Sequence, residues 1–211
     1  MTPATVFVVD DDSSMRTAVM RLLKSANLRA IAFASAEDFL RAPMPDEPCC
    51  LVLDVRMPGM SGLDLQQELA KARPDLPVIF VTGHGDIRMA VRTLQAGAVE
   101  FLPKPFQDRE FLAAVEKALR RSDAARAARK NADEVRARIA SLTPREREVM
   151  EGVVTGLLNK QIGQKLGTSE KTVKVHRARV MEKMGVSSVA DLVRMVTAVN
   201  AGVSPPGAPT R

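Results

Sequence analysis

Short, continuous apolar runs alternate with helix-patterned stretches from Val6 to about Arg121. Runs of this kind are typical of strands in a parallel sheet whose two faces are both buried. Each run is followed by enough chain for a helix. The predicted strands are Val6–Val9, Leu51–Leu53, Val78–Val81 and Phe101–Leu102, with Ile31–Phe33 as a further, second strand.

The stretches between the runs predict five helices with short connections. Ser13 or Ser14 can cap the first helix, whose apolar residues recur at helical spacing. Five β-α units joined in this way predict a three-layer α/β domain. The other helices are predicted over Ala36–Leu40, Leu63–Ala72, Asp86–Ala96 and Phe106–Arg121.

The composition changes after Arg121. Residues 122–140 are rich in Ala and Arg and contain no helix breaker, which predicts that the fifth helix continues as a largely exposed spacer. Beyond it the signals are all helical, and Thr143, Pro144 and Glu146 form a typical helix start. The predicted organisation is a domain over residues 1–122, a helical linker over 123–140, a second domain over 141–203 and a flexible tail over 204–211.

The formal net charge of +6 is unevenly distributed along the chain. Residues 1–122 carry 15 Lys and Arg against 16 Asp and Glu, a net charge of −1. Residues 123–211 carry 16 against 9, a net charge of +7. A basic second part indicates a polyanionic partner such as nucleic acid, although a merely soluble basic surface would have the same charge.

Cys49 and Cys50 are the only cysteines and are adjacent, which favours small core residues in a reducing compartment over a disulfide or a metal site. The first five residues lack the charged and apolar segments of a signal peptide. No apolar run approaches the roughly 20 residues that span a bilayer. We therefore expect a cytoplasmic protein.

Polar residues follow four of the predicted strands. Asp10 and Asp11 follow the first strand, Asp54 the third, Thr82 the fourth, and Lys104 comes shortly after the fifth. Functional groups gather at the carboxyl ends of the strands in parallel α/β sheets, so we expect these side chains on one patch. Three carboxylates, a hydroxyl and an ammonium suit a Mg²⁺ ion and a phosphoryl group.

Asp54 is the candidate nucleophile, because attack of its carboxylate on phosphorus yields an acyl phosphate. The cation and Lys104 would neutralise charge on the transferring oxygens. Thr82 can donate a hydrogen bond to the product phosphate, and its movement would leave space for Phe101 beside the fourth strand. These shifts predict that phosphorylation changes the surface formed by the fourth helix and the fifth strand.

Four segments resemble the signatures of the receiver domain in two-component response regulators of the FixJ/NarL family. They are Val8–Asp12, Leu53–Gly62, Val81–Gly85 and Phe101–Phe106. The resemblance implies an α/β flavodoxin-like fold, in which five parallel strands lie in the order 2-1-3-4-5. It also implies that a sensor histidine kinase phosphorylates Asp54.

The same resemblance implies roles for other residues of this patch. Mg²⁺ would be held by Asp11, Asp54 and the backbone carbonyl of Arg56, with Asp10 acting through water. The Lys104–Pro105 peptide bond would be cis. Phe101 replaces the Tyr found at the switch position of some receivers, so its movement would bring no hydroxyl to a hydrogen bond.

Residues 160–184 predict a helix, a tight turn at Gly167–Thr168 and a longer helix. At about 100° per residue, Val173, Val180 and Met184 fall on one side of the longer helix, where they can pack. The opposite side carries cations with small residues between them, as a helix in the major groove requires, although a solvated amphipathic helix has the same pattern. Its residues are Lys171, Lys174, Val175, Ala178 and Arg179, while His176 and Arg177 lie toward the buried margin and His176 is expected to pack or to contact a phosphate.

The segments Leu142–Met150, Asn159–Ile162 and Thr172–Arg177 resemble a LuxR-type helix-turn-helix domain, which is an all-α domain of four helices. By analogy, Lys174 and Val175 would contact bases. In this family the last helix, here Val189–Val199, helps two domains to pair, although packing within its own bundle is an equal alternative. Residues that would contact the DNA backbone by the same analogy are Asn159, Lys160 and Thr172.

Together these features predict a phosphorylation-controlled transcription regulator rather than an enzyme. Its expected partners are promoter DNA, a sensor histidine kinase and, on phosphorylation, a second copy of the chain. Asp10 and Asp12 also form the Asp-x-Asp pair of Mg²⁺-dependent phosphatases with an aspartyl nucleophile, but that scheme leaves Asp54 unexplained. A third hypothesis is a phosphorelay or protein-binding adaptor that never binds DNA.

Overall fold

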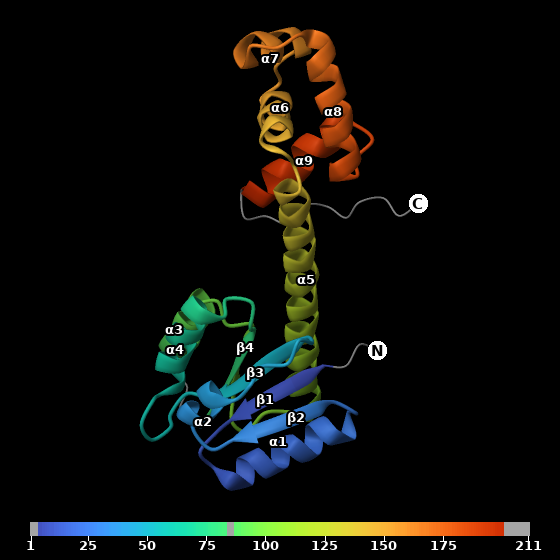
Figure 1. Cartoon of the computed structure of the whole chain (residues 1–211). Coiled ribbons are helices and arrows are strands. Elements are labelled where there is room, and N and C mark those ends of the chain that lie inside the picture. Colours follow the sequence, from blue (N-terminus) through green and yellow to red (C-terminus); the bar gives the residue numbers. More distant parts are fainter. Residues whose placement is uncertain (1–3, 84–86, 201–211) are drawn as a thin grey trace. The chain divides into compact units, whose positions relative to one another are not determined.

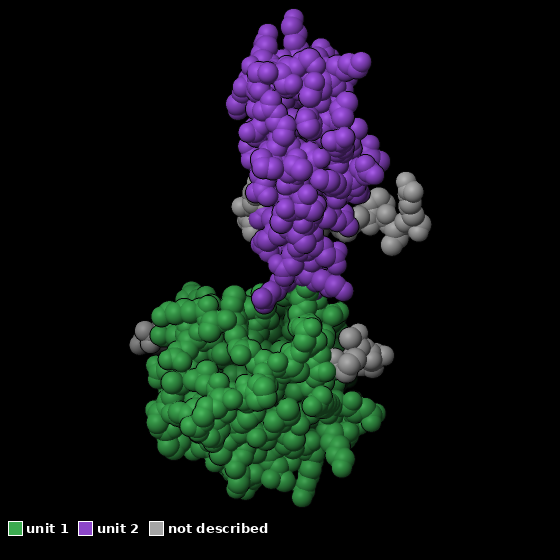
Figure 2. Space-filling model, in the orientation of Figure 1, with its two compact units in different colours: residues 1–126 green, residues 127–211 purple. Residues whose placement is uncertain are grey.

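A computed structural model describes residues 4–83 and 87–200 of the chain. The chain divides into two compact units, residues 1–126 and residues 127–211, which are coloured separately in Figure 2. The predicted start of the fourth helix at Asp86 and the predicted tail over 204–211 lie outside the described residues. Each unit has its own hydrophobic core.

The first unit is built on a five-stranded parallel sheet (Figure 1). The strand order is β2-β1-β3-β4-β5, which confirms the predicted order. The register pairs Val9 with Leu53 and Thr82 with Pro103, so the carboxyl ends of neighbouring strands lie level with one another. The strands are β1 (Thr5–Val9), β2 (Arg29–Phe33), β3 (Cys49–Asp54), β4 (Val78–Thr82) and β5 (Glu100–Pro103).

Helices cover both faces of this sheet, as the continuous apolar runs predict. One face packs on α1 (Ser13–Ser25) and α5 (Asp108–Ala140), and the other packs on α2 (Ala36–Arg41) and α3 (Gly62–Ala72). The remaining helix of the unit is α4 (Ile87–Gln95). The two edge strands, β2 and β5, are the least buried, because each has a single neighbouring strand.

Helix α5 runs without interruption from Asp108 to Ala140 and includes the predicted linker. It begins two residues later than predicted, because the Phe106 ring instead stacks on Phe111, with 5.1 Å between the ring centroids. The linker is also less exposed than predicted. Ala132 and Val135 are buried, since these small apolar residues, three positions apart, share one side of the helix.

The second unit is helical throughout its described residues. Its helices beyond α5 are α6 (Pro144–Val154), α7 (Asn159–Leu166), α8 (Glu170–Met184) and α9 (Val189–Asn200). Their apolar faces form one core, to which Val135 of α5 also belongs. No described helix combines the length and the apolar content needed to cross a membrane.

The buried carboxylate of Glu146 forms an ion pair with the exposed Lys183 in the second unit. Glu146 Oε2 lies 2.6 Å from Lys183 Nζ and also accepts a hydrogen bond from the backbone N–H of Thr143, 2.9 Å away. Thr143 in turn caps α6, so the helix start predicted from the sequence is present. The hydrogen bond from Lys183, followed by that from Thr143, lowers the pKa of Glu146 to about 2.

We predict that this carboxylate makes the second unit sensitive to acid. Because the pKa of Glu146 is lowered on folding, its stabilising effect is complete above the ordinary value of 4.5 and is lost as the pH falls toward 2. Glu146→Gln should therefore reduce the fall in melting temperature of the full-length chain between about pH 6 and about pH 3, measured by calorimetry. Glu148→Gln, an exposed carboxylate on the same helix, is the matched control; equal acid sensitivity in wild type and E146Q would contradict the prediction.

Candidate functional site

Three charged side chains from three different strands meet at the carboxyl end of the sheet. The ammonium of Lys104 lies 2.7 Å from Asp10 Oδ2 and 3.0 Å from Asp54 Oδ1. Both carboxylates are largely buried, whereas Lys104 is partly exposed. One cation is therefore shared between two carboxylates, beside the surface of the unit.

The backbone that follows each strand orients these carboxylates. Asp54 Oδ2 accepts a hydrogen bond from the N–H of Arg56 at 2.8 Å, and Asp10 Oδ1 accepts one from the N–H of Asp12 at 2.9 Å. The backbone N–H of Lys104 donates a hydrogen bond to the backbone carbonyl of Thr82 at 2.8 Å. The Lys104–Pro105 bond is cis, as the family resemblance implies.

Burial and charge shift the pKa values of this group. Burial raises the pKa of the Asp54 carboxyl, and this effect exceeds the lowering by its hydrogen bond from Lys104. For Lys104, partial burial acts to lower the pKa, but the hydrogen bonds to Asp10 and Asp54 outweigh it and raise the pKa above its ordinary value. Lys104 therefore remains a cation at neutral pH.

The other predicted residues of the patch lie around this trio. Thr82 is buried at the end of β4. Phe101 is partly buried and packs against the core on the side of α2 and α3. The side chains of Asp11 and Arg56 are exposed. Within residues 4–83 and 87–200, no three acidic, His or Cys side chains are already placed to hold a metal ion together.

The second unit contains two helices joined by a tight turn. Helix α7 ends at Gly167, which adopts a left-handed conformation with φ +63°, and Ser169 then caps α8 by accepting the N–H of Thr172 at 3.1 Å. Val173, Val180 and Met184 of α8 are fully buried, which confirms the predicted packing side. The opposite side of α8 is therefore left for solvent or a partner.

The basic side of α8 is exposed. Val175 retains 48% of its surface, and Lys174 makes only an exposed pair with Glu170 at 3.5 Å. Thr172 is partly buried, and its hydroxyl lies 2.9 Å from that of Ser169, so it contributes to the start of the helix. The other exposed residues of the predicted interface are Lys160, Lys171, Ala178 and Arg179.

Each of the two units matches a known protein family. Residues 6–116 match the response regulator receiver domain, and residues 140–196 match the luxR family of bacterial regulatory proteins. The chain belongs to the response regulator family. The resemblance inferred from the sequence motifs is confirmed.

Relatives match this chain over most of its length. The response regulator is 50% identical over 194 residues to nodulation protein W of Bradyrhizobium diazoefficiens, covering 92% of this chain and 86% of the relative. It is 46% identical over 200 residues to the transcriptional regulatory protein FixJ of Azorhizobium caulinodans, covering 95% and 94%. A low-resolution structure of the response regulator StyR has 47% identity and a TM-score of 0.80, covering 92% of this chain and 98% of that one.

Receiver domains of response regulators use Mg²⁺ for phosphorylation, and the donor atoms of this receiver suit that ion. Asp11, Asp54 and the backbone carbonyl of Arg56 provide oxygen, which Mg²⁺ prefers, and Asp10 offers a further carboxylate to a bound water. Mg²⁺ keeps several of its waters and needs only one or two carboxylates, so three carboxylates placed in advance are not required. Asp10 and Asp54 already converge on one positive charge, that of Lys104.

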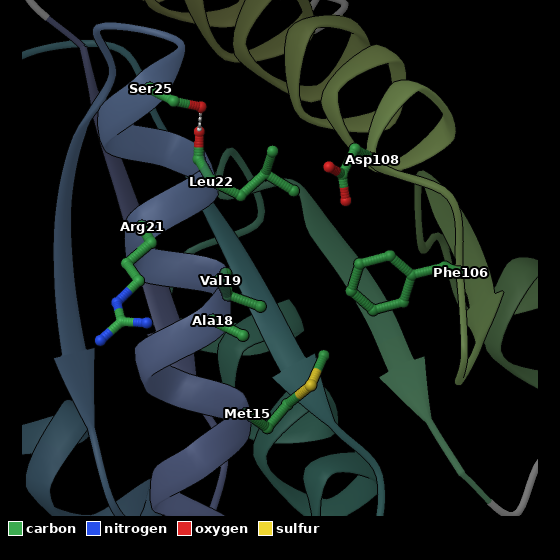
Figure 3. Close-up of a pocket in the computed structure, with 8 residues that line it drawn as sticks. All are labelled: Met15, Ala18, Val19, Arg21, Leu22, Ser25, Phe106 and Asp108. Atoms are coloured by element: carbon green, nitrogen blue, oxygen red, sulfur yellow. Dashed lines mark hydrogen bonds between the residues drawn. The ribbon is translucent and has the colours of Figure 1, made fainter.

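One hollow of the receiver is lined by residues other than these carboxylates. It has a volume of about 350 Å³ and is lined by α1 and by Phe106 and Asp108 at the start of α5 (Figure 3). Met15, Val19 and Leu22 face the Phe106 ring across it, whereas Asp10, Asp54 and Lys104 are not among its lining residues. The charged group is therefore separate from this hollow.

Two arginines of this response regulator have roles that sequence reasoning missed. Arg16 Nη1 donates to the carbonyl of Asp10 at 2.8 Å and so supports the loop after β1. Arg177 Nη1 donates to Asn159 Oδ1 at 2.9 Å and ties α8 to the first residue of α7. Asn159, predicted to contact the DNA backbone, therefore also holds the two helices together.

Proposed function

We propose that this response regulator is a DNA-binding transcription regulator controlled by phosphorylation of Asp54. The observation that carries the proposal is the position of the Lys104 ammonium between Asp10 and Asp54, in a chain that also contains a luxR-family unit. The names of its relatives, transcriptional regulatory protein FixJ among them, support regulation of transcription.

In the proposed reaction, an Asp54 carboxylate oxygen attacks the phosphorus of a phosphohistidine on a sensor histidine kinase. The new P–O bond forms as the P–N bond breaks, and the electron pair of that bond leaves with the histidine nitrogen. Lys104, which faces the same carboxylate, neutralises negative charge on the transferring oxygens. Mg²⁺, held by Asp11, Asp54 and the Arg56 carbonyl with Asp10 acting through water, would supply further charge neutralisation.

Phosphorylation is proposed to act through Thr82 and Phe101. A hydroxyl of Thr82 turned toward the phosphoryl group would open space beside β4, and Phe101, only partly buried, is the adjacent aromatic side chain that can enter it. Helix α4 leaves 46% of Val91 and 44% of Leu94 exposed. Pairing of two phosphorylated receivers through the face of α4 and β5 would cover this apolar surface.

The proposed DNA contact is the exposed side of α8. Lys174 and Val175 would reach base edges, and Lys160, Lys171 and Arg179 would neutralise phosphates. A pair of chains presents two such helices, so pairing raises the effective affinity without any new contact to DNA. Phosphorylation would thereby control occupancy of a promoter.

We expect the affinity of the phosphorylated full-length chain for DNA to fall steeply with salt. If two copies of α8 neutralise six or more phosphates, affinity for labelled genomic fragments should drop about a thousandfold between roughly 50 and 200 mM salt in mobility-shift titrations. Lys171→Ala should flatten this dependence, whereas Lys71→Ala on α3 of the receiver should not. No shift under any condition would favour the adaptor hypothesis, and an unchanged slope in K171A would remove Lys171 from the phosphate contacts.

A further inference from the structure

The last turn of α5 and the C-terminal end of α8 exchange hydrogen bonds within the second unit. Arg138 Nη1 of α5 donates to the carbonyl of Met184, the last residue of α8, at 2.8 Å. In the other direction, Lys183 Nζ of α8 donates to the carbonyl of Ser141, 3.3 Å away. The last carbonyls of a helix have no partner within the helix and carry partial negative charge, so a cation at this position is favourable.

Gly185 makes room for the contact between Arg138 and Met184. Gly185 ends α8 in the left-handed conformation, with φ +67°. A Cβ atom at this position would lie 2.9 Å from Arg138 Nη1, so any other residue would displace the guanidinium. The N–H groups of Gly185 and Val186 satisfy the carbonyls of Glu182 and Met181, and Arg138 satisfies that of Met184.

Further contacts hold the end of α5 within the second unit. Arg147 Nη2 of α6 donates to the carbonyl of Ile139 at 3.2 Å. Val135 is 4% exposed and belongs to the core of the second unit. The boundary between the two compact units falls after Arg126, so residues 127–140 of α5 belong to the second unit. The last turns of α5 are thus part of the same folded body as α8.

We propose that Arg138 is a positioning residue for DNA recognition, which fixes the C-terminal end of α8 from the linker helix. The N-terminal end of α8 is held separately by the Ser169 cap, and the middle of the helix is held by the bond between Arg177 and Asn159. A helix of 15 residues is about 22 Å long, so a tilt of about 5° about the Ser169 cap displaces its C-terminal end by about 2 Å and displaces Lys174 and Val175, about 8 Å along the helix, by about 0.7 Å. Contacts to base edges tolerate about 0.5 Å, so losing this anchor weakens base recognition more than phosphate contact.

This positioning role rests on the proposed function, in which α8 contacts DNA. Experiments on the full-length phosphorylated chain test the positioning role and the proposed function together. The probes are a duplex enriched from a random pool by the wild-type chain and a scrambled duplex of the same composition. Arg138→Met keeps the aliphatic stem but removes the donor, and Arg138→Lys restores a donor. Arg136→Met is the matched control, because Arg136 lies on the same helix and makes only an exposed pair with Asp133 at 2.8 Å.

We expect Arg138→Met to lower affinity for the enriched duplex about tenfold and to leave affinity for the scrambled duplex within about twofold. Arg138→Lys should recover most of the loss, and R136M should match wild type. Amide hydrogen exchange over residues 181–186 should accelerate in R138M alone. Unchanged discrimination in R138M, or equal loss on both duplexes, overturns the positioning role. A wild-type chain that enriches no sequence overturns the proposed function, and the positioning role with it, while the exchange data still report whether Arg138 holds the helix end.

Discussion

Replacing Asp54 with asparagine should prevent uptake of a phosphoryl group by the full-length chain, and with it the phosphorylation-dependent gain in DNA affinity. The amide of asparagine has the size of the carboxylate but lacks a nucleophilic oxygen anion, so no acyl phosphate can form. We expect at least a hundredfold loss of labelling, roughly the scale for removing a reacting group. Intact-mass measurement after incubation with acetyl phosphate and Mg²⁺, followed by DNA titration, checks both parts.

The matched control for this prediction is Asp46→Asn. Asp46 is in the same unit and its carboxylate is fully exposed, paired only with Arg126. The D46N variant should take up as much phosphoryl label as wild type and should show the same phosphorylation-dependent gain in DNA affinity. Equal labelling of D54N and wild type would place the phosphoryl group elsewhere. Turnover of a small phosphate ester that is lost in Asp10→Asn but kept in D54N would instead support the phosphatase hypothesis.

The meeting of Asp10, Asp54 and Lys104 could be anticipated from sequence for a simple geometric reason. Lys104 lies 94 positions after Asp10 and 50 positions after Asp54, yet all three lie at the ends of strands of one parallel sheet. Parallel strands in register bring their carboxyl ends to one edge, so finding the strands was enough to group the side chains. Continuous apolar runs reveal such strands because both faces of the sheet are covered.

Contacts made by long cationic side chains could not be anticipated in the same way. The bonds from Arg16 to Asp10 and from Arg138 to Met184 reach backbone carbonyls, and these acceptors leave no mark in the sequence. Their formation depends on rotamers and on the packing of separate helices. The buried side of the linker was also missed, because a stripe built from Ala132 and Val135 is too weakly apolar to stand out in an arginine-rich helix.

Gly62→Ala should disrupt the same site through the backbone. Gly62 begins α3, and a Cβ atom there would lie 2.1 Å from the carbonyl oxygen of Asp54 and 3.1 Å from Leu53 Cγ. The N–H of Gly62 also donates to the carbonyl of Val55 at 3.0 Å, so the end of β3 and the start of α3 cannot separate freely. Overpacking against backbone should lower the free energy of unfolding of the receiver by about 3 kcal/mol.

Calorimetry of the full-length chain checks this prediction, with a fall in melting temperature of the receiver on the order of 10 °C. Phosphoryl labelling should fall as well, because the clash acts on the backbone of Asp54 itself. Gly83→Ala is the control for stability, since a Cβ atom at Gly83 meets no heavy atom within 4 Å; it should change the free energy of unfolding by less than about 0.5 kcal/mol. If G62A and G83A have the same melting temperature, the contact between α3 and the Asp54 backbone relaxes without cost. The position of Asp54 would then depend on its side-chain hydrogen bonds with Arg56 and Lys104.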